Sequence, residues 1–205
     1  MKELIFHYYY DEGDSMKKDW RDPPNLTRLF ATLAYYHVCY VLFGTVGLIA
    51  YGAVLPTGDL DICPAPDKDN LRRLATLLSS IEAKPHIAPS TSNQKSLWQP
   101  EPLVIETFDH LFQTVLGELD IVPYPYGPNG KTDRFTYERL KECCATKRAF
   151  DIHIPVGAFE DIVASKLSAR REKDLHILPE IARLQHERAQ GKETGWPLVE
   201  ESSSE

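Results

Sequence analysis

The amino-acid sequence predicts an α/β (α+β) fold in which a short mixed sheet is covered by helices. Segments with helical spacing of apolar residues alternate along the chain with short β-branched and aromatic segments, an order typical of helices packed on a sheet. The chain has 205 residues, of which 42% are hydrophobic and 26% charged. This globular composition is sufficient for one domain of ordinary size. We therefore expect one layered domain that ends in C-terminal helices.

The first half of the chain is expected to alternate helices with strands. Leu26, Leu29, Phe30 and Leu33 have helical spacing, whereas the run "VCYVLFG" is short, apolar and aromatic, as in a buried strand. In chain order, the expected elements are a helix within 23–37, a strand within 38–44, a short helix within 45–53, a strand within 58–64 and an amphipathic helix within 67–83.

The second half begins with a proline- and serine-rich stretch that we expect to be mostly loop. Strands are expected next, then a loop "PYGPNGKTD", a short helix, a further strand and a long helical region that breaks near Lys173. Pro179 fits the first turn of the helix after that break. The expected elements are strands within 103–108, 111–117 and 118–125, a loop at 125–133, a helix within 136–145, a strand within 149–156 and helices within 158–189.

The two ends of the chain differ from this pattern. Residues 1–22 have no clear period and are expected to form an N-terminal arm, 23–188 the domain, and 189–205 a disordered acidic tail. We expect no membrane association and a cytoplasmic location, because no apolar run is long enough for a signal peptide or a membrane span. The formal net charge of −7 gives no general basic field for nucleic acid.

A pair of aspartates in the strand "GDLDICP" is the first candidate site. Side chains alternate between the faces of a strand, so Asp59 and Asp61 lie on one face while Leu60 and Ile62 face the core. Two neighbouring carboxylates repel each other unless a cation lies between them. Oxygen ligands suit Mg²⁺ or Mn²⁺, although a solvated acidic edge would give the same pattern.

A small-residue turn upstream strengthens the interpretation as a nucleotide site. Gly44 and Thr45 lie between a predicted strand and a predicted helix. Glycine permits close approach of the backbone to a phosphate, and the threonine hydroxyl can donate to the same anion. Alone, the pair would indicate only a tight turn. Together with the two aspartates, it indicates a site for a nucleoside triphosphate.

A third carboxylate is expected from the strand "ELDIVPYP". Asp120 is its first candidate, and Glu118 is a competitor because it shares the same strand face. Three carboxylates suit phosphoryl transfer with two metal ions, in which Asp120 would also help to remove the proton of the attacking hydroxyl. We therefore expect Asp59, Asp61 and Asp120 to converge.

The spacing of these elements resembles the signature of the DNA polymerase β-like nucleotidyltransferase superfamily. That signature is an apolar residue, Gly, then Gly or Ser, about a dozen residues, and Asp-apolar-Asp-apolar. Phe43, Gly44 and Thr45 match its first part, with Thr45 in place of the usual Gly or Ser, and "DLDI" at 59–62 matches its second. The segments "LGELDIVPYP" and "IVASKLSARREKDLHIL" are similar to small bacterial members, including the AbiEii-like toxin group.

This resemblance, which covers roughly residues 25–185, implies a polymerase β-like nucleotidyltransferase fold and further site residues. It implies that Lys166, from the pair Ser165-Lys166, and Arg171 bind the nucleotide. Independently of the resemblance, Lys166, Arg170 and Lys173 share one helical face. A solvated basic helix balanced by nearby acids would also explain that face. Arg171 and Asp174 lie three residues apart, a spacing that would allow them to pair and brace the helix break.

Two hypotheses follow from these patterns. In the first, the chain is a metal-dependent nucleotidyltransferase that moves a nucleoside monophosphate from an NTP to the hydroxyl of a tRNA, a protein or a small molecule. In the resembling AbiEii-like group, this activity would belong to a toxin with an antitoxin partner. In the second, the chain is a non-catalytic toxin–antitoxin component that acts by contact. The presence of all three aspartates favours the enzyme.

Overall fold

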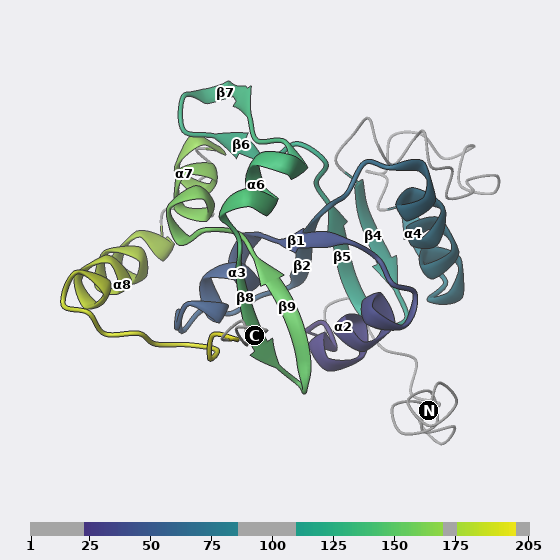
Figure 1. The fold of residues 1–205 in the computed structure, drawn as a ribbon, viewed down its shortest axis with the longest axis horizontal. Coiled ribbons are helices and arrows are strands. Elements are labelled where there is room, and N and C mark those ends of the chain that lie inside the picture. Colours follow the sequence, from purple (N-terminus) through teal and green to yellow (C-terminus); the bar gives the residue numbers. More distant parts are fainter. Residues whose placement is uncertain (1–22, 86–109, 170–175, 200–205) are drawn as a thin grey trace, which may run out of the picture.

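The computed structural model describes residues 23–85, 110–169 and 176–199, with a seven-stranded mixed sheet at the centre of the molecule (Figure 1). The strand order is β3-β4-β5-β2-β1-β9-β8. Two neighbouring pairs, β2 with β5 and β1 with β9, are parallel, and the remaining neighbours are antiparallel. The strands are β1 (Tyr40–Leu42), β2 (Asp59–Pro64), β3 (Lys84–Pro85), β4 (His110–Thr114), β5 (Gly117–Ile121), β8 (Ala145–Ala149) and β9 (Ile152–Val156).

Helices cover this sheet, as the sequence predicts. Figure 1 shows α4 at the β4 side of the molecule and α7 at the opposite side, above α3. The side chains of Asn25, Asp67 and Thr136 each accept a backbone hydrogen bond at the start of a helix, which is the expected role of these residue types. The helices are α2 (Leu26–Tyr35), α3 (Gly44–Ala50), α4 (Lys68–Ser80), α6 (Tyr137–Cys143), α7 (Phe159–Ala169) and α8 (Leu178–Ala189).

The buried core lies between the central strands and these helices. Leu42, Leu60 and Ile62 of the two strands that carry the signature are fully buried, as are Leu119 and Ile121 of β5. Burial of the alternate residues of β2 and β5 leaves Asp59, Asp61 and Asp120 on the opposite face. The predicted alternation of anchoring and acidic residues is therefore confirmed.

Two strand pairs differ from the sequence-based expectation. The expected loop at 125–133 contains a small hairpin, β6 (Tyr126–Gly127) and β7 (Gly130–Arg134). Strand β8 was not predicted, because "ATKRA" has little apolar character; it pairs antiparallel with β9. The strand expected within 103–108 and the arm at 1–22 lie outside the described residues.

The structure describes the acidic tail expected at 189–205 as far as residue 199. Here the chain runs back along β8: the Arg148 amide donates to the Pro197 carbonyl at 2.8 Å, and the Val199 amide donates to the Thr146 carbonyl at 2.9 Å. The Trp196 ring lies 5.9 Å from the Phe30 ring and 6.0 Å from the Phe150 ring. These contacts attach residues 190–199 to the domain, which their polar composition did not indicate.

The C-terminal segment also holds the end of α3. The amide of Trp196 donates to the Ala50 carbonyl at 3.0 Å, and the Thr194 hydroxyl donates to the Tyr51 carbonyl at 3.1 Å. The ammonium group of Lys147, 5% exposed as a residue, donates to the Trp196 carbonyl at 3.0 Å. Burial lowers the pKa of Lys147, and the carbonyl satisfies one of its donors.

We expect Trp196→Ala to lower the free energy of unfolding by about 2–4 kcal/mol, because it removes a large ring from an aromatic cluster. Chemical denaturation of the two proteins measures this change. Leu198→Ala is the matched control, since Leu198 is 48% exposed and its loss should change stability by about 0.5 kcal/mol or less. Equal stability of Trp196→Ala and the parent would show that the segment is not anchored by this ring.

Candidate functional site

The three predicted aspartates converge at one point of the central sheet. Strands β2 and β5 pair in parallel with Asp61 opposite Asp120 and Asp59 opposite Glu118. One carboxylate oxygen from each of Asp59, Asp61 and Asp120 lies within 4.8 Å of the others. The third member of the cluster is therefore Asp120 and not its competitor Glu118. Such a cluster of three acidic residues can bind a divalent metal ion.

The turn at Gly44 is fitted closely around Asp61. The Phe43 amide donates to the Asp61 carbonyl at 3.0 Å, which joins the end of β1 to β2. Gly44 has a φ of +65°, and a Cβ added to it would overlap the carboxyl group of Asp61. Glycine is the residue that tolerates both this backbone conformation and this approach. The Gly in the signature is thus required by the acid that it faces.

Thr45 and Lys166 meet although they are 121 residues apart in sequence. Thr45 lies in the first turn of α3, and Lys166 projects from α7. The Lys166 ammonium group donates to the Thr45 hydroxyl at 3.1 Å. Both residues were predicted to contact phosphate, and their side chains are adjacent.

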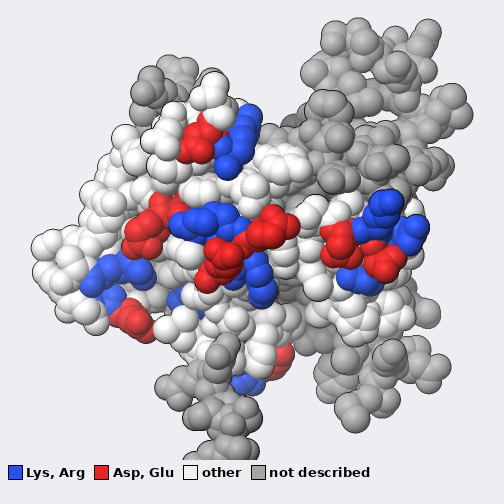
Figure 2. Space-filling view, turned by 45° about the horizontal axis from the view of Figure 1, so that its top comes forward, with Lys and Arg blue, Asp and Glu red and all other residues white. Residues whose placement is uncertain are grey.

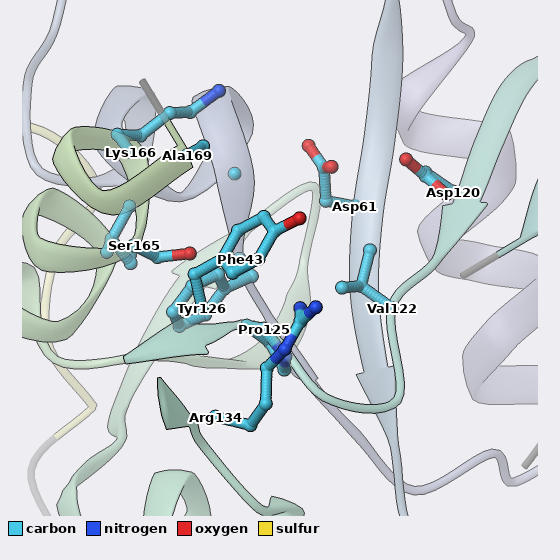
Figure 3. Close-up of a pocket in the computed structure, with 12 residues that line it drawn as sticks. Phe43, Asp61, Asp120, Val122, Pro125, Tyr126, Arg134, Ser165, Lys166 and Ala169 are labelled. Atoms are coloured by element: carbon cyan, nitrogen blue, oxygen red, sulfur yellow. The ribbon is translucent and has the colours of Figure 1, made fainter. Parts of the chain in front are cut away.

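One pocket is lined by Gly44, Asp61, Asp120 and Lys166 (Figure 3). Asp61 and Asp120 project into it from neighbouring strands, while Ser165 and Lys166 line its opposite side from α7. The cation of Lys166 and the carboxylates therefore face a shared space, which is the charge arrangement needed to hold an anion next to a metal ion.

A further wall of the pocket was missed by sequence reasoning. It is formed by Val122, Pro125, Tyr126 and Arg134, of which the last two belong to the β6–β7 hairpin. The "GPNG" run at 127–130 is a turn signal between two short segments, and it was the available clue that a hairpin folds here. Nothing in the local sequence places that hairpin beside α7.

An ion pair links helix α7 to helix α6. The Arg139 guanidinium lies 3.5 Å from the Asp161 carboxylate. Burial raises the pKa of Asp161, and the charge of Arg139 opposes this effect. The pair crosses from α6 to the turn of α7 that precedes Lys166, so it helps to fix the helix that carries the cation.

The remaining predicted nucleotide ligand lies outside the described residues. Arg171, together with Arg170, Lys173 and Asp174, falls in the segment between α7 and α8. Its role stays a prediction.

Comparison with known proteins gives a fold match. No protein family model and no curated protein matches the chain. Among solved structures, it is similar to the lincosamide antibiotic adenylyltransferase LnuA bound to lincomycin, with a TM-score of 0.51 and 17% identity over 78% of this chain and 94% of that chain. A candidate nucleotidyltransferase of Thermotoga maritima gives a TM-score of 0.44 at 12% identity, over 80% of this chain and 91% of that chain.

The first likeness shows that the chain has the fold of a nucleotidyltransferase, as its sequence predicted. The second is too distant to add to it. The fold match does not single out the AbiEii-like group. In the part of the chain that the structure describes, no helix is long and apolar enough to cross a membrane.

Proposed function

We propose that this protein is a metal-dependent nucleotidyltransferase, which transfers a nucleoside monophosphate from an NTP to an acceptor hydroxyl. One observation carries the proposal: a single pocket combines carboxylates from two parallel strands with Lys166, whose ammonium group also donates to the Thr45 hydroxyl. Fold likeness alone would leave the activity open. The chemistry of this donor set suits an anion held beside a divalent cation.

The acidic cluster and the Lys166–Thr45 pair each have a role in the proposed reaction. Asp59, Asp61 and Asp120 would hold Mg²⁺ or Mn²⁺, and two bound ions would neutralise the triphosphate and favour ionisation of the acceptor hydroxyl. Thr45 and Lys166 bind phosphate oxygens of the NTP. We assign Arg171 to the nucleotide as well, from its place in the family pattern.

The bond changes define what the protein side chains must do. The acceptor oxygen forms a bond to the α-phosphorus, the bond from that phosphorus to the bridging oxygen breaks, and pyrophosphate leaves. Asp120 accepts the proton of the acceptor hydroxyl. Lys166 stabilises the negative charge that develops on the departing pyrophosphate.

A small-molecule acceptor is favoured over tRNA. The solved structure with a similar fold is named as an adenylyltransferase of a lincosamide antibiotic. On the face drawn in Figure 2, Lys and Arg are interspersed with Asp and Glu, and the formal net charge is −7. A tRNA acceptor would be helped by a continuous basic surface.

The test is metal-dependent NTP binding and turnover. The protein is incubated with each labelled NTP and Mg²⁺, alone, with small hydroxyl compounds, with tRNA and with cell lysate, and pyrophosphate release is measured. We expect NTP binding that EDTA abolishes, and transfer in at least one mixture. If no NTP binds in the presence of Mg²⁺ or Mn²⁺, the contact-only component of a toxin–antitoxin pair becomes the better account.

Lys166→Ala should impair transfer more than Thr45→Ala. Loss of the hydroxyl removes one hydrogen bond to a charged group, on the order of 1–3 kcal/mol, so NTP use should fall by roughly tenfold or somewhat more. Loss of the ammonium group should also lower kcat, because it removes charge stabilisation of the leaving group.

Steady-state kinetics for the two variants separate these effects. Lys141→Ala, which changes an exposed lysine on α6, is the matched control and should behave as the parent. A Lys166→Ala variant with unchanged kcat would contradict the role in leaving-group stabilisation.

A further inference from the structure

Arg134 presents a cation that the reaction described above does not use. Its guanidinium lies 3.9 Å from the centre of the Tyr126 ring and donates to the Tyr124 carbonyl at 3.0 Å. These contacts fix its position and leave other N–H donors of the fork. Among the described residues, no carboxylate lies within ion-pair distance of it, although Arg134 lines the same pocket as Asp61 and Asp120.

The remaining charges of the pocket already have partners in the proposed complex. Asp61 and Asp120 face the metal site, and Lys166 lies beside Thr45, where the triphosphate is proposed to bind. Figure 3 shows Arg134 rising from the hairpin, well apart from Lys166 on α7. The Arg134 guanidinium is therefore placed to bind a group other than the metal ion or the triphosphate.

The position of the hairpin indicates which group that is. The chain leaves β5 after Ile121, one residue beyond Asp120, and the Val122 amide extends the pairing by donating to the Ile62 carbonyl at 2.8 Å. Val122, Pro125 and Tyr126 then form the wall that continues from Asp120. Since Asp120 is the proposed proton acceptor for the hydroxyl, the molecule that carries the hydroxyl must lie against this wall.

We infer that Arg134 is a specificity-determining residue, which selects an acceptor that carries an oxyanion, either a carboxylate or a phosphate, in addition to its hydroxyl. The inference rests on the proposed function. A guanidinium fork binds planar or tetrahedral oxyanions through paired hydrogen bonds.

Binding of matched small molecules to the whole chain tests this inference. The probes are glycerol with glycerol 3-phosphate, glycerol with glycerate, and ribose with ribose 5-phosphate, each titrated calorimetrically against the Mg²⁺-loaded protein. We expect the charged member of at least one pair to bind at least about tenfold more tightly than the neutral member, since charge-assisted hydrogen bonds to a guanidinium are stronger than neutral ones. The phosphate and carboxylate pairs distinguish the two oxyanions.

Arg134→Gln should abolish that preference and leave NTP binding within about twofold of the parent. Arg72→Gln is the matched control, because Arg72 pairs with Asp69 on the exposed face of α4, and it should keep the preference. Thermal unfolding of both variants verifies that they are folded.

Three results would overturn the inference. They are equal binding of charged and neutral members in every pair, an unchanged preference in Arg134→Gln, and a loss of NTP binding in that variant equal to its loss of oxyanion binding. The last would assign Arg134 to the nucleotide. Failure of the proposed function is distinguishable, since it would appear as an absence of metal-dependent NTP binding in the parent protein.

Discussion

Asp61→Asn is expected to abolish nucleotidyl transfer and Mg²⁺-dependent NTP binding while the protein stays folded. Asp61 is the central member of the acidic cluster, since it lies opposite Asp120 across the strand pair and beside Asp59 on its own strand. An amide of the same shape keeps the packing against Gly44 but supplies no negative charge to a cation. Without metal, the variant also loses repulsion between neighbouring carboxylates, so its stability should be equal to or slightly above that of the parent.

Three measurements check this expectation: pyrophosphate release, calorimetric NTP binding with and without EDTA, and denaturant unfolding. Glu118→Gln is the control, because Glu118 is a carboxylate on the same face of β5 that stays outside the cluster. We expect it to retain transfer within about tenfold. Transfer at the parental rate by Asp61→Asn would remove the metal site from the mechanism.

The sequence predicted those elements whose local pattern and tertiary burial agree. Strand β2 is an example, since Leu60 and Ile62 alternate with the aspartates and are fully buried. Strand β8 was missed because its environment comes from elsewhere: Lys147 is buried beneath Trp196, and the C-terminal segment bonds to the neighbouring backbone. The sequence of this polar pentapeptide does not indicate a contact with residues about fifty positions away. Its low strand propensity was therefore overridden by tertiary packing.

The candidate site was predictable where it follows strand alternation and the spacing of the signature. Alternation placed Asp59 and Asp61 on one face, and the second acidic strand supplied Asp120. Arg134 was not predictable, because its place in the pocket depends on how the β6–β7 hairpin packs beside α7. Lys166 stands between these cases: the family pattern named it, and the fold supplies its contact with Thr45.

Gly44→Ala should impair NTP binding and lower the stability of the fold. It tests whether the backbone turn that holds Asp61 in place is required in addition to the charged groups themselves. The φ of +65° at this position costs a non-glycine residue about 1–2 kcal/mol, and the new methyl group would displace the Asp61 carboxyl group. We therefore expect a loss of about 2–4 kcal/mol in stability and the loss of metal-dependent NTP binding, although every charged group remains. Gly58→Ala is the matched control, since a Cβ there meets nothing within 4 Å, and it should bind NTP as the parent does.

Unfolding curves and calorimetric NTP titrations of the two variants provide the comparison. A Gly44→Ala protein that binds NTP with parental affinity would show that Asp61 does not need the position in which this turn holds it, and the metal site would have to be built from other groups.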